Sequence, residues 1–251
     1  AGVTVARPRR SRGGSLCEEL VTASGDHVIL TCMDRAAGGK KGPTGWSELE
    51  IEAYGQLLGA LHRASETYRP AHGVARRPDW HDPLFDPGLN RTDTAPALRE
   101  RYHARHAACV IHPAGGTDLL IHLDAHHGNL FTTGGPQLTL FDFDDCGYGT
   151  ATHDVAIVLF YWLMGHDSPL EELRRFSQIF LSGYQKHAKL PPSWAEGAER
   201  FLSLRELEIY YLLSEVPPAN WNERHRGFMA NREQRILQGR PYLGLAIAEV
   251  L

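Results

Sequence analysis

Residues 121–130 of this sequence read Ile-His-Leu-Asp-Ala-His-His-Gly-Asn-Leu, and residues 141–145 read Phe-Asp-Phe-Asp-Asp. In both places polar residues come directly after a short apolar run, 119–121 in the first case and 138–141 in the second. Such runs are typical of buried strands, and burying an unpaired carboxylate costs several kcal/mol. We therefore expect these acidic residues to lie at strand ends and to line a site.

The spacing of the polar residues fits phosphoryl transfer from a nucleotide. That reaction needs a carboxylate that orients the attacking hydroxyl and accepts its proton, and oxygen ligands for a Mg²⁺ ion on the phosphates. Kinases supply these groups from the pattern His-x-Asp-x-x-x-x-Asn and from a later Asp at a strand end. Here His122, Asp124 and Asn129 meet the pattern, and Asp142 supplies the later carboxylate.

Other interpretations use the same residues. A metal-dependent hydrolase would bind zinc through the cluster of His122, Asp124, His126 and His127. Adjacent histidines rarely bind one ion, however. Residues 140–146 also resemble the nucleophile loop of haloacid-dehalogenase-like phosphatases, although Cys146 stands where that loop has Thr or Val. A last alternative is that the carboxylates end strands without any chemical role.

Together the two segments resemble the catalytic loop and the metal-binding loop of aminoglycoside phosphotransferase-like kinases. The common form in that family is His-Gly-Asp-x-His-x-x-Asn, followed by a hydrophobic residue, Asp and an aromatic residue. Weaker similarities at 55–62, 152–156, 180–184 and 205–210 extend the resemblance over most of the chain. Among subgroups the sequence is most similar to the bacterial branch that includes stress-response Ser/Thr kinases and homoserine-kinase-like enzymes.

The resemblance implies a role for each matching residue. Asp124 would be the catalytic base that positions the acceptor hydroxyl. Asn129 and Asp142 would hold Mg²⁺ at the phosphates of ATP. His122 would brace the catalytic loop, and Asp154 would anchor the backbone of that loop from below.

Further residues have supporting roles in the resemblance. His126 would brace the catalytic loop or contact the substrate, and Asp144 would support the metal-binding loop. Residues 32–35 would form a hinge between two lobes, where the backbone at Met33 and Arg35 meets the adenine. An ordinary strand end fits that segment nearly as well.

The sequence departs from the family pattern in two ways. Leu123 replaces the usual glycine, which we expect to alter only local packing. Kinases also bind the nucleotide phosphates with a strand lysine, but Lys40 and Lys41 are the first lysines and both follow the candidate hinge. We therefore expect either that the first small-lobe strands belong to a longer gene product or that ordinary ATP binding has been lost.

The missing lysine leaves two functions open. The first is an ATP- and Mg²⁺-dependent phosphotransferase that acts on a hydroxyl of a small molecule or of a protein Ser/Thr, with little turnover from these 251 residues alone. The second is a kinase-like binding module without turnover. The presence of Asp124, Asn129 and Asp142 together favours the first.

Composition narrows the class of protein. Hydrophobic residues make up 42% and charged residues 22%, which predicts a packed core. The net charge of -4 argues against nucleic-acid and membrane-surface partners. A net-acidic large lobe would suit cationic acceptors such as aminoglycosides or choline, but a net charge of -4 is too small to decide the acceptor. His81, Asp82, Glu206 and Glu208 are candidate contributors or ordinary surface residues. Four cysteines without a CxxC pair favour a reducing cytoplasm.

Periodicity and turn signals complete the predicted architecture. Strands at 16–21 and 27–33 form a hairpin, and Ser47 with Glu50 fits a capping box at the start of a helix. Thr152 is the expected cap of a helix over 153–164, which Gly165 is expected to end. The other helices are expected at 97–109, 169–187, 194–214 and 228–250.

These elements predict an α+β fold with segregated layers. With the resemblance, the fold class becomes a protein-kinase-like fold of the aminoglycoside phosphotransferase type, with a truncated small β lobe and a mainly helical large lobe. Residues 1–36 would hold the residual small-lobe strands and the hinge. Residues 37–251 would form the large lobe with the catalytic and metal-binding loops.

Overall fold

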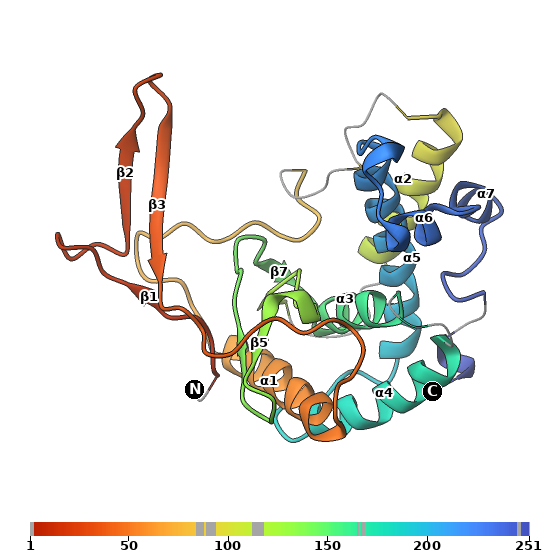
Figure 1. Cartoon of the computed structure of the whole chain (residues 1–251), viewed down its shortest axis with the longest axis horizontal. Coiled ribbons are helices and arrows are strands. Elements are labelled where there is room, and N and C mark those ends of the chain that lie inside the picture. The colour runs from red at the N-terminus through yellow and green to blue at the C-terminus, as the bar shows by residue number, and fades with distance from the viewer. Residues whose placement is uncertain are drawn as a thin grey trace.

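The computed structural model describes residues 3–83, 88, 94–111, 118–164, 166, 169–244 and 247–250. A small β-sheet stands out from a mainly helical body (Figure 1). This is the segregated α+β arrangement that the order of sequence patterns predicts. Within the described ranges, no helix combines the length and the apolar character needed to cross a bilayer.

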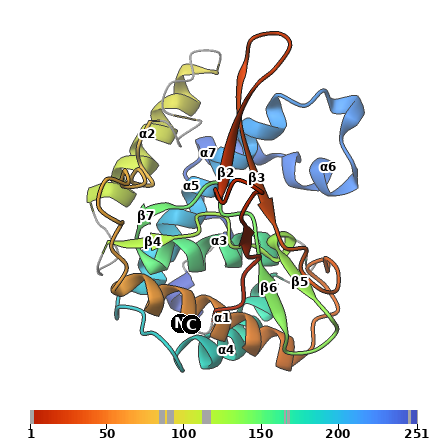
Figure 2. The same cartoon turned by 90° about the vertical axis from the view of Figure 1, so that its left-hand side faces the viewer.

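The small sheet has three antiparallel strands in the order β1-β3-β2. They are β1 (Pro8–Arg9), β2 (Cys17–Val21) and β3 (His27–Met33). The predicted hairpin is confirmed, and its turn contains Gly25 at φ 88°, a conformation that favours glycine. Every residue of the three strands is exposed, because the sheet projects beyond the helices (Figure 2).

The segments that enter and leave the small sheet are hydrogen-bonded to a second hairpin, β5 (Leu130–Thr132) with β6 (Leu138–Leu140). The N–H of Ala6 donates to the carbonyl oxygen of Leu140 at 2.9 Å, and the N–H of Gly39 donates to that of Thr132 at 3.1 Å. The small sheet is therefore attached to β5 and β6, the two strands next to the polar segments at 122–129 and 141–145. The proposed division at residues 36 and 37 stays a prediction.

The first helix, α1 (Glu48–Glu66), begins with the predicted capping box. The Ser47 hydroxyl accepts the N–H of Glu50 at 3.3 Å, and the Glu50 carboxylate accepts the N–H of Ser47 at 2.8 Å. Lys41 adds an ion pair to Glu50 at 2.9 Å. Burial raises the pKa of Glu50, but the bonds from Lys41 and Ser47 outweigh burial and leave this pKa below its usual value.

Helix α1 packs closely against α4 (Pro169–Tyr184). A Cβ at Gly55 would collide with the carbonyl oxygen of Phe180, and a Cβ at Gly183 would collide with that of Glu52. The glycines therefore allow the two helix backbones to approach more closely than larger residues would permit.

The most buried helix is α3 (Ala151–Leu163), which packs against α4 and α5 (Trp194–Ser214). The predicted cap at Thr152 is wrong. The helix begins at Ala151 with Thr150 at the N-cap, and the hydroxyl of Thr152 is buried without a partner among the described residues. The predicted end at Gly165 lies outside the described residues.

The prediction of one last helix over 228–250 is also wrong. The structure has α6 (Glu223–Met229) and α7 (Arg232–Leu237) instead. The break occurs because Asn231 adopts a left-handed conformation at φ 55°, which cannot continue an α-helix. The other elements of this helical region are α2 (Pro96–Ile111) and short 3₁₀ turns at Pro218–Asn220 and Ile247–Glu249.

A third sheet consists of β4 (Leu119–Ile121) and β7 (Gly147–Gly149), which are antiparallel with Ile121 opposite Gly147. The chain runs from β4 through residues 122–129, which we call the catalytic loop, into β5. It runs from β6 through residues 141–146, the acidic loop, into β7. Both loops therefore begin at the ends of short buried strands, as predicted.

His153 of α3 is a buried histidine that makes stability depend on pH. Its ring stacks on Phe201 at 4.0 Å and meets the edge of Trp80 at 5.0 Å. Burial is the largest cause that lowers the His153 pKa, from 6.5 to about 3. Between these two values the unfolded chain binds a proton that the native chain does not. The free energy of unfolding therefore falls as the pH drops below 6.5.

Replacing His153 with phenylalanine should keep the ring packing and remove this titration. Going from pH 7 to pH 5, the variant should lose about 2 kcal/mol less unfolding free energy than the unchanged protein. Urea unfolding at both pH values measures the difference. His72→Phe, at an exposed histidine, is the control and should leave the pH dependence unchanged. Equal pH dependence in His153→Phe and the parent would contradict the assignment.

Candidate active site

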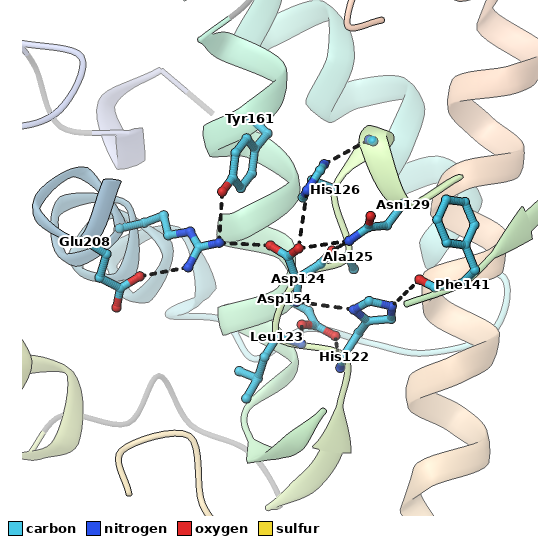
Figure 3. A network of polar contacts seen from close by, with 12 residues as sticks. His122, Leu123, Asp124, Ala125, His126, Asn129, Phe141, Asp154, Tyr161 and Glu208 are labelled. Atoms are coloured by element: carbon cyan, nitrogen blue, oxygen red, sulfur yellow. Dashed lines mark hydrogen bonds and ion pairs between the residues drawn. The ribbon is translucent and has the colours of Figure 1, made fainter. Parts of the chain in front are cut away.

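Asp154 of α3 holds the start of the catalytic loop from beneath (Figure 3). Its carboxylate accepts the backbone N–H of His122 at 2.8 Å and that of Leu123 at 2.7 Å. On its other side, Nε2 of His62 lies 3.1 Å from Oδ2 of Asp154, and Nδ1 of His62 lies 2.8 Å from the Tyr184 hydroxyl. The backbone of the loop is therefore tied to three helices, α1, α3 and α4.

The charge of Asp154 is maintained although its side chain is fully buried. Burial raises the pKa of this carboxyl, but the hydrogen bond from His62, the electrostatic interactions with His62 and His122, and the bond from the His122 backbone outweigh it and lower the pKa. An ionised carboxylate accepts hydrogen bonds more strongly than a neutral acid does. The contact is the one that the resemblance implies for Asp154.

Each loop contains one non-glycine residue in the left-handed region, Leu123 at φ 64° and Asp142 at φ 68°. We expected Leu123 to alter only packing. Its side chain does pack beside Ile121 and Trp80, but its backbone conformation also costs roughly 1–2 kcal/mol relative to glycine. Strained residues of this kind cluster at functional sites.

His122 connects the two loops. Its Nδ1 accepts the backbone N–H of Asp124 at 3.2 Å, so the ring hydrogen is on Nε2, which donates to the carbonyl oxygen of Phe141 at 3.0 Å. Phe141 is the residue before Asp142. The buried imidazole therefore fixes the distance between the loop that carries Asp124 and the loop that carries Asp142.

The carboxylate of Asp124 is surrounded by donors (Figure 3). Oδ1 accepts from Nη2 of Arg205 at 2.9 Å, and Oδ2 accepts from Nδ2 of Asn129 at 2.9 Å. Nε2 of His126 lies 3.3 Å from Oδ2. Burial raises the pKa of Asp124, but the contact with His126, the charge of Arg205 and electrostatic interactions with His126 and His122 outweigh it, so the pKa of Asp124 lies below its usual value. The carboxylate is ionised, oriented and 19% exposed.

Asn129 has its amide nitrogen committed to the catalytic loop, because Nδ2 also donates to the backbone oxygen of Asp124 at 2.9 Å. Its amide oxygen points away from Asp124 (Figure 3). Oxygen ligands of this type suit hard divalent cations. Asn129 can therefore offer an oxygen to a ligand without giving up its contacts with the loop.

Three carboxylates of the acidic loop, Asp142, Asp144 and Asp145, are exposed. Burial and the nearby charges of Asp124, Asp142 and Asp144 raise the pKa of Asp145, against a smaller opposing effect of Arg205. The two loops therefore share one acidic surface. Among the described residues, no group of three or more His, Cys, Asp or Glu side chains is arranged to hold a metal ion.

The histidines of the catalytic loop do not assemble a zinc site. Nδ1 of His126 accepts the N–H of Gly128 at 2.9 Å, and both ring nitrogens of His122 are already bonded. His127 is buried, and burial lowers its pKa to about 4. The predicted alternative of a hydrolase built on this cluster has no support in the geometry.

The residues of the candidate hinge lie away from this network. Met33 is the last residue of β3, and both Met33 and Arg35 are exposed. The described hydrogen bonds and ion pairs do not join either side chain to the catalytic loop. Lys40 lies 5.0 Å from the ring centre of Phe141, and Lys41 is paired with Glu50.

Two residues of the site, Arg205 and Tyr161, were not assigned to it from the sequence. Arg205 of α5 contacts Asp124, the Tyr161 hydroxyl at 2.9 Å and Glu208 at 3.0 Å. Glu208, one of the two acidic candidates, is therefore part of the site. Glu206, the other candidate, faces the helical core and pairs with Arg105 at 3.1 Å and with Arg232 at 2.7 Å.

Comparison with known proteins gives a consistent result. Residues 42–196 match the profile of the phosphotransferase enzyme family. The chain is 26% identical over 263 residues to amicoumacin kinase of Bacillus subtilis (strain 168), a match that covers 96% of this chain and 73% of that protein. It is 30% identical over 199 residues to an uncharacterized protein of Synechocystis sp., covering 75% of this chain and 52% of that protein.

Among solved structures, amicoumacin kinase hAmiN in complex with AMP-PNP, Ca²⁺ and Ami has a TM-score of 0.84 at 24% identity, over 100% of this chain and 77% of that chain. A microcompartment-associated aminopropanol kinase has a TM-score of 0.71 at 20% identity, over 98% and 79% of the two chains. These likenesses confirm the predicted kinase-like fold class.

Proposed function

The chain belongs to the phosphotransferase enzyme family, and from this premise we propose that it transfers the γ-phosphoryl group of ATP to a hydroxyl group of a small molecule. One observation carries the proposal. His122 holds together the loop with the ionised Asp124 and the loop with Asp142. Phosphoryl transfer needs a base for the acceptor hydroxyl beside ligands for the metal on the phosphates.

In this proposal Asp124 is the catalytic base. Its lowered pKa keeps the carboxylate ionised, so it can accept a hydrogen bond from the acceptor hydroxyl. Such a bond orients the hydroxyl oxygen toward the phosphoryl group. As the new oxygen–phosphorus bond forms, the bond from the γ-phosphorus to the β-phosphate oxygen breaks, ADP leaves, and the hydroxyl proton passes to Asp124. His122 and Asp154 act through the loop backbone and do not touch the reacting atoms.

Asn129 and Asp142 would hold the divalent metal, and Asp144 would add negative charge beside it. The donor set fits such an ion, because the free amide oxygen of Asn129 and the exposed carboxylate of Asp142 are oxygen ligands. The metal, which we propose to be Mg²⁺, would neutralise charge on the transferred group. The related structure with AMP-PNP contains Ca²⁺, another hard cation.

The adenine would contact the backbone near Met33 and Arg35, at the end of β3. Both residues are exposed. Residues 1–39 contain no lysine, and Lys41 forms an ion pair with Glu50. If a longer gene product supplies a strand lysine, its turnover should exceed that of the 251-residue chain.

We infer that the acceptor is an alcohol that carries an amino group. The acidic loop presents Asp142, Asp144 and Asp145 to solvent beside the base, and a cation near them is favoured electrostatically. The similar aminopropanol kinase acts, by its name, on an amino alcohol. A small molecule is favoured over a protein side chain because both named relatives are small-molecule kinases.

The test measures ADP release from ATP with Mg²⁺ and a panel of acceptors: an aminopropanol, choline, an aminoglycoside and a Ser/Thr peptide. The 251-residue chain is assayed in parallel with a longer product if its gene encodes one. At least one amino alcohol should give metal-dependent ADP release and a phosphorylated product in mass spectra. Nucleotide binding without transfer to any acceptor, in both forms of the protein, would instead support a binding module without turnover.

A further inference from the structure

The carboxylate proposed as the base is held by an arginine from a distant helix. Nη2 of Arg205 on α5 lies 2.9 Å from Oδ1 of Asp124, and the two side chains are each 19% exposed. A partly buried arginine–carboxylate pair is stronger and more directional than an exposed pair. The orientation of Asp124 therefore depends on where α5 places this guanidinium.

Arg205 is itself fixed on two sides. Its Nη1 lies 3.0 Å from Glu208, one turn further along α5, and its Nη2 also donates to the Tyr161 hydroxyl of α3 at 2.9 Å. The ring of Tyr161 packs on the ring of His126 with centroids 4.2 Å apart. Nε2 of His126 lies 3.3 Å from Oδ2 of Asp124, so Arg205, Tyr161 and His126 form a continuous chain of contacts from one carboxylate oxygen to the other (Figure 3).

These contacts leave limited room for a further hydrogen bond to the carboxylate of Asp124. A carboxylate has about four acceptor positions. On Oδ2 Asn129 donates and Nε2 of His126 lies 3.3 Å away, whereas on Oδ1 the described donor is Arg205. Oδ1 is therefore the less crowded oxygen. An acceptor hydroxyl that bonds to Oδ1 has the guanidinium as its neighbour, so the guanidinium determines where that hydroxyl sits.

Arg205 makes its described contacts through its two terminal nitrogens, which bind Asp124, Tyr161 and Glu208. Its Nε is buried without a hydrogen-bond partner among the described residues, as is Nε of Arg235. Glu206, the next residue of α5, shows the contrasting case. It is 1% exposed and paired with two arginines in the helical core.

We infer that Arg205 is a positioning residue for the proposed transfer reaction, which orients Asp124 so that one acceptor position on Oδ1 receives the substrate hydroxyl. This inference rests on the proposed function. Lysine cannot replace Arg205, because an ammonium lacks the planar fork that contacts Asp124, Tyr161 and Glu208 together.

The test compares Arg205→Ala and Arg205→Lys with the parent, using the acceptor identified for the parent. Both variants should lower kcat by roughly 10–100-fold, since a misplaced catalytic group costs about this much. The KM for ATP should stay within about two-fold. Millimolar guanidinium chloride should restore much of the kcat of Arg205→Ala, whereas potassium chloride at the same concentration should not.

A matched control and a milder variant complete the design. Arg63 forms the same i,i+3 pair with Glu66, but on the exposed side of α1, so Arg63→Ala should keep the parent kcat. Tyr161→Phe keeps the ring on His126 and removes only the hydroxyl that fixes Arg205. It should lower kcat by about 3–10-fold, and it carries the test if Arg205→Ala does not fold.

The outcomes distinguish a failure of the proposed transfer reaction from a failure of the role of Arg205. A parent without transfer activity, or with activity that Asp124→Asn leaves unchanged, overturns the proposed function. If Asp124→Asn abolishes transfer, three results overturn the role of Arg205 alone. These are a parent-like kcat in a folded Arg205→Ala or in Tyr161→Phe, a loss that resides in the KM for ATP, and a loss in folded Arg205→Ala that guanidinium does not restore.

Discussion

Replacing Asp124 with asparagine is expected to lower kcat by about 10²–10⁴-fold, because an amide cannot accept the proton of the acceptor hydroxyl. The nucleotide affinity should change only modestly, since the metal ligands proposed for the phosphates are Asn129 and Asp142. Steady-state ADP release with the acceptor at saturation gives kcat, and titration with a non-hydrolysable nucleotide gives the affinity.

The Asp124→Asn substitution also changes the contacts at this position, so the stability of the variant must be measured. The new amide would keep one oxygen for Arg205 or for Asn129 but lose the ion pair with Arg205. Thermal unfolding therefore accompanies the kinetics. The control is Asp79→Asn, at an aspartate whose side chain is 42% exposed and paired with Arg76, which should keep the parent kcat. An unchanged kcat in a folded Asp124→Asn protein would remove Asp124 from the mechanism.

The convergence of the catalytic loop and the acidic loop could be predicted, because each of the two motifs directly follows a short apolar run. The position of Asp154 beneath the catalytic loop followed from the family resemblance alone. Its contacts with the N–H groups of His122 and Leu123 add a physical reason, since the loop backbone would otherwise bury unpaired donors. The roles of Asp124, Asn129 and Asp142 stay predictions until they are tested.

Arg205 could not be assigned to the site from the sequence, because 81 positions separate it from Asp124. The helix that carries it was predicted correctly, but the sequence does not show which neighbour each face of α5 meets. A signal was present, since Arg205 lies four residues after Phe201 and four before Ile209, which are both buried. A charged residue on an apolar helix face usually has a charged partner.

The errors at helix boundaries have local causes. Thr150 and Thr152 both fit a cap, and only the backbone decides between them: Thr150 is extended at ψ 148°, whereas Thr152 is already helical. The prediction of a helix over 228–250 did not take into account that asparagine, here Asn231, readily adopts the left-handed conformation. Apolar periodicity predicts that a helix is present more reliably than it predicts where the helix begins and ends.

Replacing Asp154 with asparagine is expected to lower the free energy of unfolding by about 3–5 kcal/mol, because it breaks a buried, charge-assisted network. The amide oxygen could still accept one backbone N–H, from His122 or from Leu123. The amide nitrogen would then face the other N–H or the ring of His62, donor against donor. Urea unfolding at pH 7 measures the loss, with Asp118→Asn as the exposed control.

The same substitution distinguishes an anchor from a residue of the chemical step. Asp154 is fully buried beneath the loop, so its removal should act on turnover only by displacing Asp124. We expect kcat to fall by about 10²-fold at a temperature where the variant is folded, because a shift of about 1 Å in a catalytic group has this effect. A folded Asp154→Asn protein with parent kcat and parent stability would show that the loop holds its shape without this carboxylate.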